Sequence, residues 1–317
     1  MKIGVDIMGG DHAPRETTLG AIQAQKELPS HFELVLFGDE NAIKKILAEE
    51  GADLSLFKIV HSTEVIEMSE NPTKAIQQKP DSSMSLGFKF LAEKKIDGFC
   101  SAGNSGAMLV GSMFSVKTIP GIMRPSLSTV VPKESGKNGI LLDVGANADC
   151  KPEHLVQFAV VGSLLAQHVF HLDKPKVGLM NIGHEEKKGN ILAQSTHKLL
   201  SESKQVNFIG NVEGRDLFNE KADVIVCDGF TGNIILKLSE SFYYLLKKRE
   251  MTNDYFERFN FENAGGSPIL GVNAPVVVGH GISKKKAIKN MILLTKEVAD
   301  VGLIEKIAKV SQLTSVT

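Results

Sequence analysis

Two lysines, an arginine and an asparagine stand in settings where they could hold an anion. Lys187 and Lys188 lie in HEEKKGN, Arg124 in PGIMRPS, and Asn233 ends CDGFTGN. An arginine between a methionine and a proline suits bidentate recognition of phosphate or carboxylate. The lysines could equally belong to a solvated turn, and Asp228 and Asn233 could equally be turn and capping residues. Together, these residues predict an anion site built from cations and amides.

Glycine-rich segments follow most of the predicted strands. They read DIMGGDHAP, SAGNSGA, DVGANADCKPEHL, NIGHEEKKGN, GNVEGRD and DGFTGN. In an open parallel sheet the carboxyl ends of the strands lie along one edge, where ligands bind. Glycine allows close backbone approach, and the N-terminus of the next helix offers free N–H groups. The repeated pattern predicts a ligand cleft at this edge.

Several other kinds of chemistry are disfavoured. Neither a G-x-G-x-x-G after the first strand nor a G-x-x-x-x-G-K-[ST] occurs, and GHGISKKK has only the first two glycines of a dinucleotide turn. HExxH and EF-hand patterns are missing too, so we predict no metal and no cofactor.

Two of the cysteines and two of the histidines are predicted to have structural rather than catalytic roles. Cys100 and Cys227 lie at strand ends, where thiols commonly pack as small apolar groups, and no histidine adjoins them in sequence. A covalent cysteine mechanism is therefore a minor hypothesis. His12 and His154 stand at predicted helix starts, where a structural role is the commoner one.

The composition places the chain among ordinary globular proteins. Of its 317 residues 42% are hydrophobic and 23% charged, with a formal net charge of -1. A net charge this close to zero gives the protein no overall positive electrostatic potential that would attract nucleic acid or an anionic membrane surface. Cys100, Cys150 and Cys227 form no CxxC pair, and MKIGVDIMGGDHAP does not resemble a signal peptide. We therefore expect a cytoplasmic protein that does not bind nucleic acid.

Short β-branched runs alternate with longer helical patterns along the chain. Ten strands are predicted, at KIGVDIM, FELVLFG, LFKIVHS, DGFCSAG, STVVP, GILLDVG, KVGLMNIG, VNFIGNV, ADVIVCDG and APVVVGHG. Several are apolar on both faces, which is typical of strands covered by helices above and below. The alternation predicts an α/β fold, a three-layer α/β/α sandwich with a long, mostly parallel central sheet.

The organisation of the chain is predicted to be simple. No repeat or linker divides it, so residues 1–317 are expected to form a single α/β/α unit. Residues 239–266 are interpreted as a shortened helical excursion on the surface. The apolar segment LVQFAVVGSLLAQHVFHL, introduced by Pro152, is interrupted by glutamine and histidine and is predicted to be a buried helix rather than a membrane span.

The quoted segments, taken in order, carry a family resemblance. VDIMGGDHAP, SAGNSGA, PGIMRPS, LLDVGANADCKPEHLVQFA, NIGHEEKKGN, FIGNVEGRD, DGFTGNIILK and GGSPILGV resemble the phosphate acyltransferase of bacterial phospholipid synthesis. The resemblance runs from the first residues to VVVGHG. It implies a fold like that of phosphotransacetylases and isopropylmalate dehydrogenases, and a homodimer.

The resemblance also implies a reaction and its partners. Inorganic phosphate attacks the long-chain acyl thioester carried by acyl carrier protein, giving acyl phosphate. A membrane glycerol-3-phosphate acyltransferase uses that product downstream. Phosphate is itself the nucleophile, so this chemistry requires neither a metal nor a side-chain nucleophile.

Residue roles follow from the resemblance position by position. Catalysis is assigned to Lys188 and Asn233, with Lys187 as an alternative to its neighbour. The remaining residues are expected to line the substrate region: Asn104, Ser105 and Arg124 near the phosphate or thioester, and Asp6, Gly9, Gly10, Asp11, Asn147, Asp149, Asp228 and Thr231 around them.

Two departures from the family pattern stand out. Position 184 is histidine, where relatives vary and acidic residues are common. The segment between Leu246 and Gly265 is short and lacks the apolar tip of a longer helical hairpin that relatives use for membrane contact and carrier docking. Peripheral contact with the inner face of the cell membrane is therefore an open alternative for this chain.

Three other functions stay open at this point. The cleft chemistry would also serve a coenzyme A-linked phosphotransacylase. A non-catalytic module that binds phosphate or acyl ligands would fit the same fold. A dehydrogenase is the weakest of the three, since similarity of fold says little about activity. Basic segments LLKKRE and GISKKKAIKN favour an acidic carrier protein, although such lysines are also typical of solvated helix faces.

Overall fold

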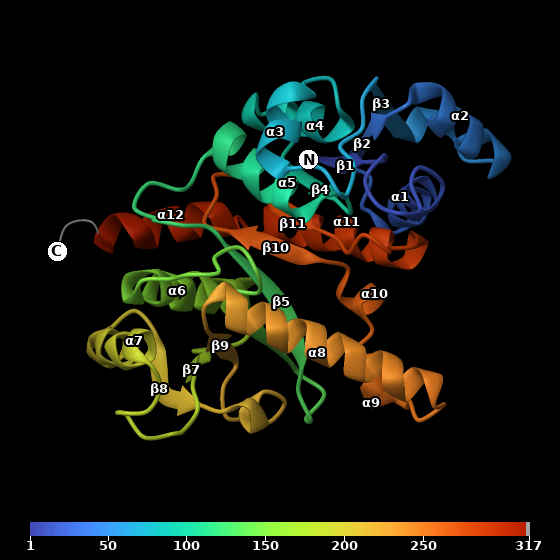
Figure 1. The fold of residues 1–317 in the computed structure, drawn as a ribbon. Coiled ribbons are helices and arrows are strands. Elements are labelled where there is room, and N and C mark those ends of the chain that lie inside the picture. The colour runs from blue at the N-terminus through green and yellow to red at the C-terminus, as the bar shows by residue number, and fades with distance from the viewer. Residues whose placement is uncertain (315–317) are drawn as a thin grey trace. The chain divides into compact units, whose positions relative to one another are not determined.

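The chain forms two compact units in a computed structural model that describes residues 1–314. Unit 1 comprises residues 1–118 and 261–304, and unit 2 comprises residues 119–260 and the chain from 305 on. Each unit has its own strands and helices (Figure 1). The sequence predicted a single unit over residues 1–317.

Unit 1 is built on a largely parallel set of strands. In the order β3-β2-β1-β4-β11-β10, β10 runs antiparallel to β11 and the other neighbours are parallel. The strands are β1 (Lys2–Asp6), β2 (Glu33–Gly38), β3 (Phe57–His61), β4 (Gly98–Ser101), β10 (Ser267–Leu270) and β11 (Val276–Val278). Pairing of β1 with both β2 and β4 places it inside this set.

Helices cover both faces of the unit 1 strands. Alternate residues of β1, such as Ile3 and Val5, pack in one core with residues of α1 (Arg15–Glu27), α2 (Glu40–Glu49) and α11 (Lys285–Asp300). On the other face Phe99 packs edge-on against Phe37 and against Phe88 of α4 (Ser83–Ala92). The remaining elements of unit 1 are α3 (Pro72–Gln78), α5 (Ser105–Gly111), η1 (Leu54–Leu56), η2 (Ser112–Val116) and α10 (Phe261–Ala264).

Unit 2 has the strand order β5-β6-β9-β7-β8. The strands β5 and β6 form an antiparallel pair, and the others run parallel to their neighbours. Their bounds are β5 (Ser126–Pro132), β6 (Asn138–Leu142), β7 (Lys176–Met180), β8 (Asn207–Val212) and β9 (Val224–Val226). The parallel strands β6, β9 and β7 therefore end at one edge, and the loops that follow them are neighbours.

Two helices cover opposite faces of β6 and β9. Gly162 of α6 (Pro152–His168) lies against Leu142 and Val224, whereas Leu141 and Ile225 pack on the side of α8 (Gly229–Lys248). The other helical elements are α7 (Ile191–Glu202), η3 (Gly214–Asp216), α9 (Asp254–Glu257) and α12 (Leu303–Thr314). Each unit thus has helices on both faces of its strands.

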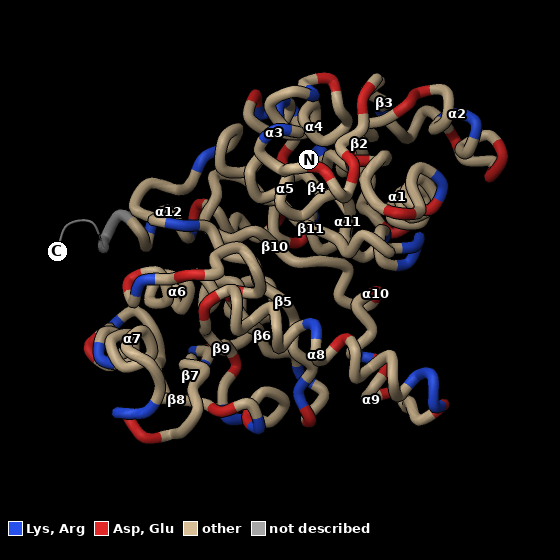
Figure 2. The backbone as a smooth tube through the Cα atoms, viewed as in Figure 1, with Lys and Arg blue, Asp and Glu red and all other residues tan. Residues whose placement is uncertain are grey.

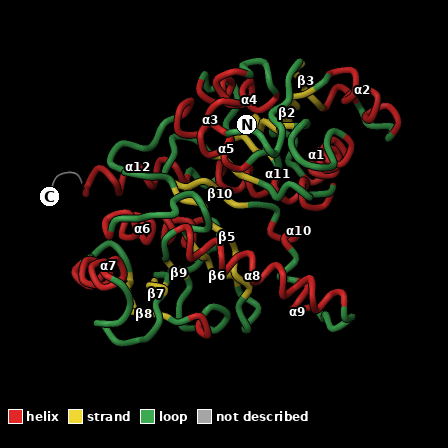
Figure 3. Tube along the Cα trace, in the orientation of Figure 1, coloured by secondary structure: helices red, strands yellow, loops and turns green. Residues whose placement is uncertain are grey.

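The sequence predicted these elements largely correctly. All ten expected strands are present, and strands and helices alternate along the chain (Figure 3). The α/β class and the mostly parallel strands are confirmed. The predictions missed β10 and the two antiparallel pairs, because alternation of element types carries no information on strand direction. Acidic and basic residues are interleaved along both units, in keeping with the small net charge (Figure 2).

The segment predicted as an excursion divides between the units, and its part up to residue 260 is fastened to the strands of unit 2. Residues 239–266 contain the end of α8, then α9 and α10. Arg258 donates to the carbonyl of Lys133 at 3.0 Å and to Oδ1 of Asn138 at 2.8 Å, so this segment is tied to the β5–β6 hairpin. Tyr243 of α8 donates to Oε2 of Glu257 at 2.8 Å.

The long apolar segment behaves as predicted. Its residues 155–168 lie in α6, with Pro152 in the first turn and most of the segment's apolar side chains buried. Within residues 1–314, no helix has both the length and the apolar character needed to cross a membrane.

Candidate functional site

A buried carboxylate organises the end of β6 in unit 2. Asp143 is fully buried, and its oxygens accept hydrogen bonds from the backbone N–H groups of Leu127 (2.9 Å), Ala146 (3.2 Å) and Asn147 (2.7 Å). The side-chain amide of Asn147 donates to Asp143 at 2.9 Å and to the carbonyl of Pro125 at 2.7 Å. Burial raises the pKa of Asp143 although these hydrogen bonds oppose the shift. Asn147, predicted to line the site, therefore holds the loop in place.

The first turn of α8 packs closely on this loop. The backbone N–H of Gly229 donates to the carbonyl of Asn147 at 2.7 Å. A Cβ at Gly232 would overlap the carbonyl oxygen of Asp143, so only glycine permits this approach. Asp228 caps the helix by accepting from the N–H of Thr231 at 2.8 Å and from its hydroxyl at 2.9 Å. Asp228 thus has the capping role that the sequence left open for it, and Thr231, predicted to line the substrate region, donates to this cap.

Asn233 stands one residue after this close contact. Its side chain is exposed and lies beside Gly145, where an added Cβ would be 3.5 Å from Oδ1 of Asn233. Gly145 has a φ of 133°, which favours glycine. The fold therefore brings an exposed amide to the edge formed by the ends of β6 and β9.

Arg124 and Asp149 meet on the same unit. Nη1 of Arg124 donates to the backbone carbonyl of Asp149 at 3.1 Å, and both side chains are exposed. The arginine therefore braces the loop after β6 from the segment before β5. Gln157 of α6 fixes that segment by accepting from the N–H of Met123 at 2.9 Å and donating to the carbonyl of Gly121 at 2.7 Å.

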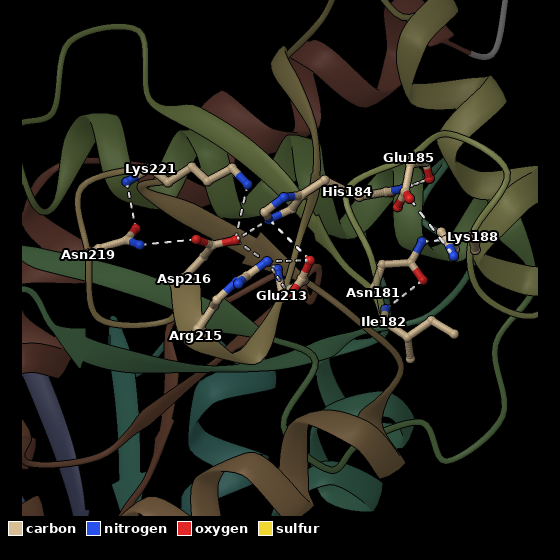
Figure 4. Close-up of polar contacts among 11 residues, drawn as sticks. Asn181, Ile182, His184, Glu185, Lys188, Glu213, Arg215, Asp216, Asn219 and Lys221 are labelled. Atoms are coloured by element: carbon tan, nitrogen blue, oxygen red, sulfur yellow. Dashed lines mark hydrogen bonds and ion pairs between the residues drawn. The ribbon is translucent and has the colours of Figure 1, made fainter.

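Lys187 and Lys188 lie on residues 181–190, the connection between β7 and α7, named here the lysine loop. Both side chains are exposed, and the ammonium of Lys188 is 3.9 Å from Oε1 of Glu185 (Figure 4). Because β7 and β9 are adjacent and parallel, the lysine loop and the start of α8 lie at the same strand edge. The structure thus places the predicted residues of unit 2 on the three loops that follow β6, β7 and β9 and on the segment before β5.

A second cluster occupies the ends of β1 and β4 in unit 1. Asp6 is buried and accepts from the hydroxyl of Ser101 at 2.6 Å and from the N–H of Met8 at 3.0 Å. Burial raises the pKa of Asp6 against the effect of these hydrogen bonds. A Cβ at Gly9 would come within 2.6 Å of the Ser101 hydroxyl, and Gly10 has a φ of 107°. Both glycines are required by this backbone path.

The other predicted residues of unit 1 differ in burial and in hydrogen-bond partners. Asn104 is buried, caps α5 through Ala107 N–H at 3.0 Å, and donates to the carbonyls of Met68 (3.1 Å) and Glu70 (3.0 Å). Its amide therefore joins α5 to the loop before α3. Ser105 and Asp11 are exposed, and the N–H of Asp11 donates to the carbonyl of Gly281 at 2.8 Å.

The thiols are poorly suited to nucleophilic chemistry. Burial raises the pKa of Cys100 to about 12 and that of Cys150 to about 11, and it also raises the pKa of Cys227. A thiol is a nucleophile only as thiolate, so each is inert near neutral pH. His154 is buried and its Nδ1 accepts from the N–H of Lys151 at 3.1 Å, a capping contact at the start of α6.

Two buried polar groups were missed by the sequence reasoning. Asp143 in LLDVGAN repeats the setting of Asp6 in GVDIMGG, since each is the acidic residue at a strand end before a glycine turn. That repetition was a usable signal. No comparable sequence signal identifies Ser101, because serine before a glycine turn is common in loops of every kind.

Solved structures similar in fold to this chain include phosphotransacetylases. The chain superimposes on a phosphotransacetylase from Streptococcus pyogenes with a TM-score of 0.68 and 17% identity, covering 95% of this chain and 94% of that one. The EutD phosphotransacetylase from Staphylococcus aureus gives a TM-score of 0.64 at 17% identity, with 94% of each chain covered. At this identity the likeness establishes the fold.

Sequence relatives establish the family. The model of the family described as "Fatty acid synthesis protein" matches residues 1–248, ending where α8 ends. The phosphate acyltransferase of Dictyoglomus thermophilum is 43% identical over 97% of this chain and 96% of its own length. That of Acetivibrio thermocellus is 42% identical over 97% and 95%. The resemblance seen in the sequence is confirmed, and this chain belongs to the phosphate acyltransferase family of acyl-transferring enzymes.

Proposed function

We propose that this protein transfers a long-chain fatty acyl group from acyl carrier protein to inorganic phosphate, giving acyl phosphate for phospholipid synthesis. The observation that carries the proposal is the family membership over 97% of the chain. The arrangement of Asn233 and the lysine loop at one strand edge of unit 2 supports it.

In the proposed reaction an oxygen of inorganic phosphate forms a bond to the thioester carbonyl carbon. The carbon–sulfur bond then breaks, and its electron pair leaves with the sulfur as a thiolate, which takes up a proton. Thiols have pKa values near 8.5, so the thiolate leaves without a strong general acid.

The exposed groups of unit 2 suit the charges in this reaction. The ammonium groups of Lys187 and Lys188 would balance the charge of phosphate and hold it for attack. The amide of Asn233 would donate to the oxyanion that develops on the carbonyl carbon, an interaction worth roughly 10²–10³ in rate for one donor. The variants Lys187→Ala and Lys188→Ala distinguish which of the two lysines contacts phosphate.

Apolar side chains around the same groups support a long acyl chain. Ile182 in the lysine loop and Ile191 directly after it are 82% and 85% exposed, and Phe230, three residues before Asn233 in α8, is 63% exposed. Large apolar side chains in water-facing positions at a site indicate an apolar ligand. We assign the acyl chain to this surface.

Basic residues support an acidic carrier protein as the acyl donor. Lys247 and Lys248 lie in the last turn of α8, where Figure 2 shows basic residues, and Arg249 follows. Lys284, Lys285 and Lys286 are exposed at the start of α11. Such clusters steer an oppositely charged partner and make binding sensitive to salt.

An exposed apolar row along α8 supports a homodimer. Its side chains are at least half exposed and recur every three or four residues, on one face of the helix, at Ile234, Leu238, Phe242 and Leu245. Light scattering of the purified protein would give its mass, and sedimentation with anionic vesicles would test peripheral membrane contact. A monomer that binds vesicles would assign the row to the membrane, close to the downstream glycerol-3-phosphate acyltransferase.

The decisive experiment is phosphorolysis of palmitoyl-acyl carrier protein. Free carrier thiol would be measured with and without inorganic phosphate. We expect phosphate-dependent release that falls at least a hundredfold in Lys188→Ala or Asn233→Ala. Lys187→Ala tests the neighbouring lysine, and Lys198→Ala, an exposed lysine on α7, is the matched control.

Other outcomes separate the remaining functions. Consumption of coenzyme A thioesters in place of the carrier substrate would favour a coenzyme A-linked phosphotransacylase. Binding of phosphate or acyl donor without any turnover would identify a binding module. Thiol release that does not need phosphate would overturn direct phosphorolysis.

A further inference from the structure

The lysine loop has two anchors close to its ends. Nδ2 of Asn181 donates to the carbonyl of Lys188 at 3.1 Å, and its Oδ1 accepts from the N–H of Ile182 at 2.8 Å (Figure 4). Nε2 of Gln194 in α7 donates to the carbonyl of Gly189 at 3.0 Å. These contacts fix where the loop leaves β7 and where it enters α7.

The middle of the lysine loop is held by side chains from other segments. Nδ2 of Asn211 on β8 donates to the carbonyl of Glu185 at 2.8 Å. Nε2 of His184 is 2.8 Å from Oδ2 of Asp216 in η3 and 3.5 Å from Oε1 of Glu213 (Figure 4). A carboxylate only accepts, so Nε2 of His184 carries the hydrogen of the shorter contact. His184 is thus the side chain by which the loop itself reaches η3.

Asp216 is a rigid anchor for that contact. Its side chain is 8% exposed, and it also accepts from the N–H of Glu213 (3.0 Å), Nζ of Lys221 (3.0 Å) and Nδ2 of Asn219 (3.1 Å). A carboxylate held by several donors cannot follow a moving loop. The imidazole therefore ties the loop to a fixed point.

The His184–Asp216 contact matters because, within residues 1–314, the ammonium of Lys188 makes only one weak interaction of its own. Its side chain is 50% exposed, and the 3.9 Å separation from Oε1 of Glu185 is a weak, solvated ion pair. The backbone N–H of Lys188 donates to the carbonyl of Glu185 at 3.1 Å, so the position of the lysine follows that of residues 184 and 185.

We propose that His184 is a positioning residue, which holds the lysine loop through Asp216 so that Lys187 and Lys188 face the bound phosphate. This inference rests on the proposed function only for the identity of the ligand. The tether itself is a property of the folded chain and can be measured without turnover.

The first test measures the tether by hydrogen exchange of the amides in residues 182–190. We expect faster exchange in His184→Ala and recovery in His184→Gln, whose Nε2 can replace the imidazole donor. Arg215→Ala is the matched control, because the Arg215 guanidinium lies in the same turn and donates to Glu213, so its removal leaves the His184–Asp216 hydrogen bond intact. Asp216 is left intact, since its removal would also release Lys221 and Asn219. Unchanged exchange in His184→Ala would overturn the proposal.

The second test measures phosphorolysis in the same variants. We expect kcat to fall on the order of tenfold or more in His184→Ala, since misplaced catalytic groups cost that much, with KM for the acyl donor unchanged. The loss should shrink when His184→Ala is added to Lys188→Ala, because the histidine acts through the lysines of this loop. Faster exchange with unchanged kcat would overturn the positioning role. If the wild type has no phosphorolysis activity, the proposed function fails while the exchange data still decide the tether.

Discussion

Asn147 donates two hydrogen bonds to one carboxylate oxygen, Oδ2 of Asp143, from its backbone N–H at 2.7 Å and from its side-chain amide at 2.9 Å. The pair closes the turn after β6 into a small ring of buried polar contacts. Because α8 begins against the carbonyl of Asn147, this ring also fixes the helix that carries Asn233.

Asp143→Ala should destabilise the protein strongly. The substitution leaves the buried N–H of Asn147 and the part-buried N–H groups of Leu127 and Ala146 without their acceptor, and an unpaired donor that is buried costs roughly 1–3 kcal/mol. We expect the free energy of unfolding in urea to fall by at least about 3 kcal/mol. Asp149→Ala, an exposed acidic residue on the same loop, should change it by less than about 0.5 kcal/mol. Equal effects of the two substitutions would contradict this account.

Gly232→Ala should disrupt the start of α8. The new Cβ would overlap the backbone carbonyl of Asp143, and backbone cannot move aside as a flexible side chain can. We expect a loss of roughly 1–3 kcal/mol or more in unfolding free energy, together with loss of activity as Asn233 shifts. The control is Gly214→Ala, where an added Cβ meets nothing within 4 Å. A Gly232→Ala protein as stable and active as wild type would show that this contact is not required.

The three thiols should be unreactive in the folded protein. With the pKa of Cys150 at about 11, its thiolate is a very small fraction at pH 8, and Cys100 and Cys227 are buried. Iodoacetamide at pH 8 should label all three only after unfolding, as read by mass spectrometry. Cys150→Ser should keep wild-type phosphorolysis. Rapid native labelling with loss of activity would restore the covalent hypothesis.

Protonation of Asp216 in η3 should lower the unfolding free energy of the protein at acid pH. Burial opposes ionisation of this carboxyl, but hydrogen bonds from Glu213 N–H, His184, Asn219 and Lys221 outweigh it and lower its pKa well below the ordinary value. The folded state therefore binds this proton more weakly than the unfolded chain does. The contribution is fully present above about pH 5 and is lost progressively as the pH falls below that value.

Asp216→Asn removes this titration. Between pH 5 and pH 3 the unfolding free energy of Asp216→Asn should fall less steeply than that of wild type, as measured by urea unfolding at each pH. Arg215→Ala, which keeps the carboxyl and its donors, should follow the wild-type slope. Identical slopes for Asp216→Asn and wild type would remove Asp216 from the acid response.

Much of the molecule could be predicted from local sequence alone. Alternation and β-branched runs located ten strands, Pro152 marked the start of α6, and the glycine turns identified the strand ends that carry Asp6, Asn147 and Asn233. These features depend on backbone geometry and side-chain period, which each short segment carries by itself. The family could be identified for the same reason, since its motifs are contiguous strings.

Other features required the tertiary structure. Whether Asn147 binds a ligand or a neighbouring carboxylate depends on Asp143 and Pro125, which only the fold brings to it. His184 and Asp216 are 32 residues apart and meet because β7 and β8 pair and extend into adjacent loops. Hydrogen-bond partners are set by contacts between distant segments, and these contacts leave no pattern within either segment. The chain's sequence thus determined its elements and its family, and the packing of those elements decided which polar residues hold the scaffold and which ones stand exposed at the strand edge.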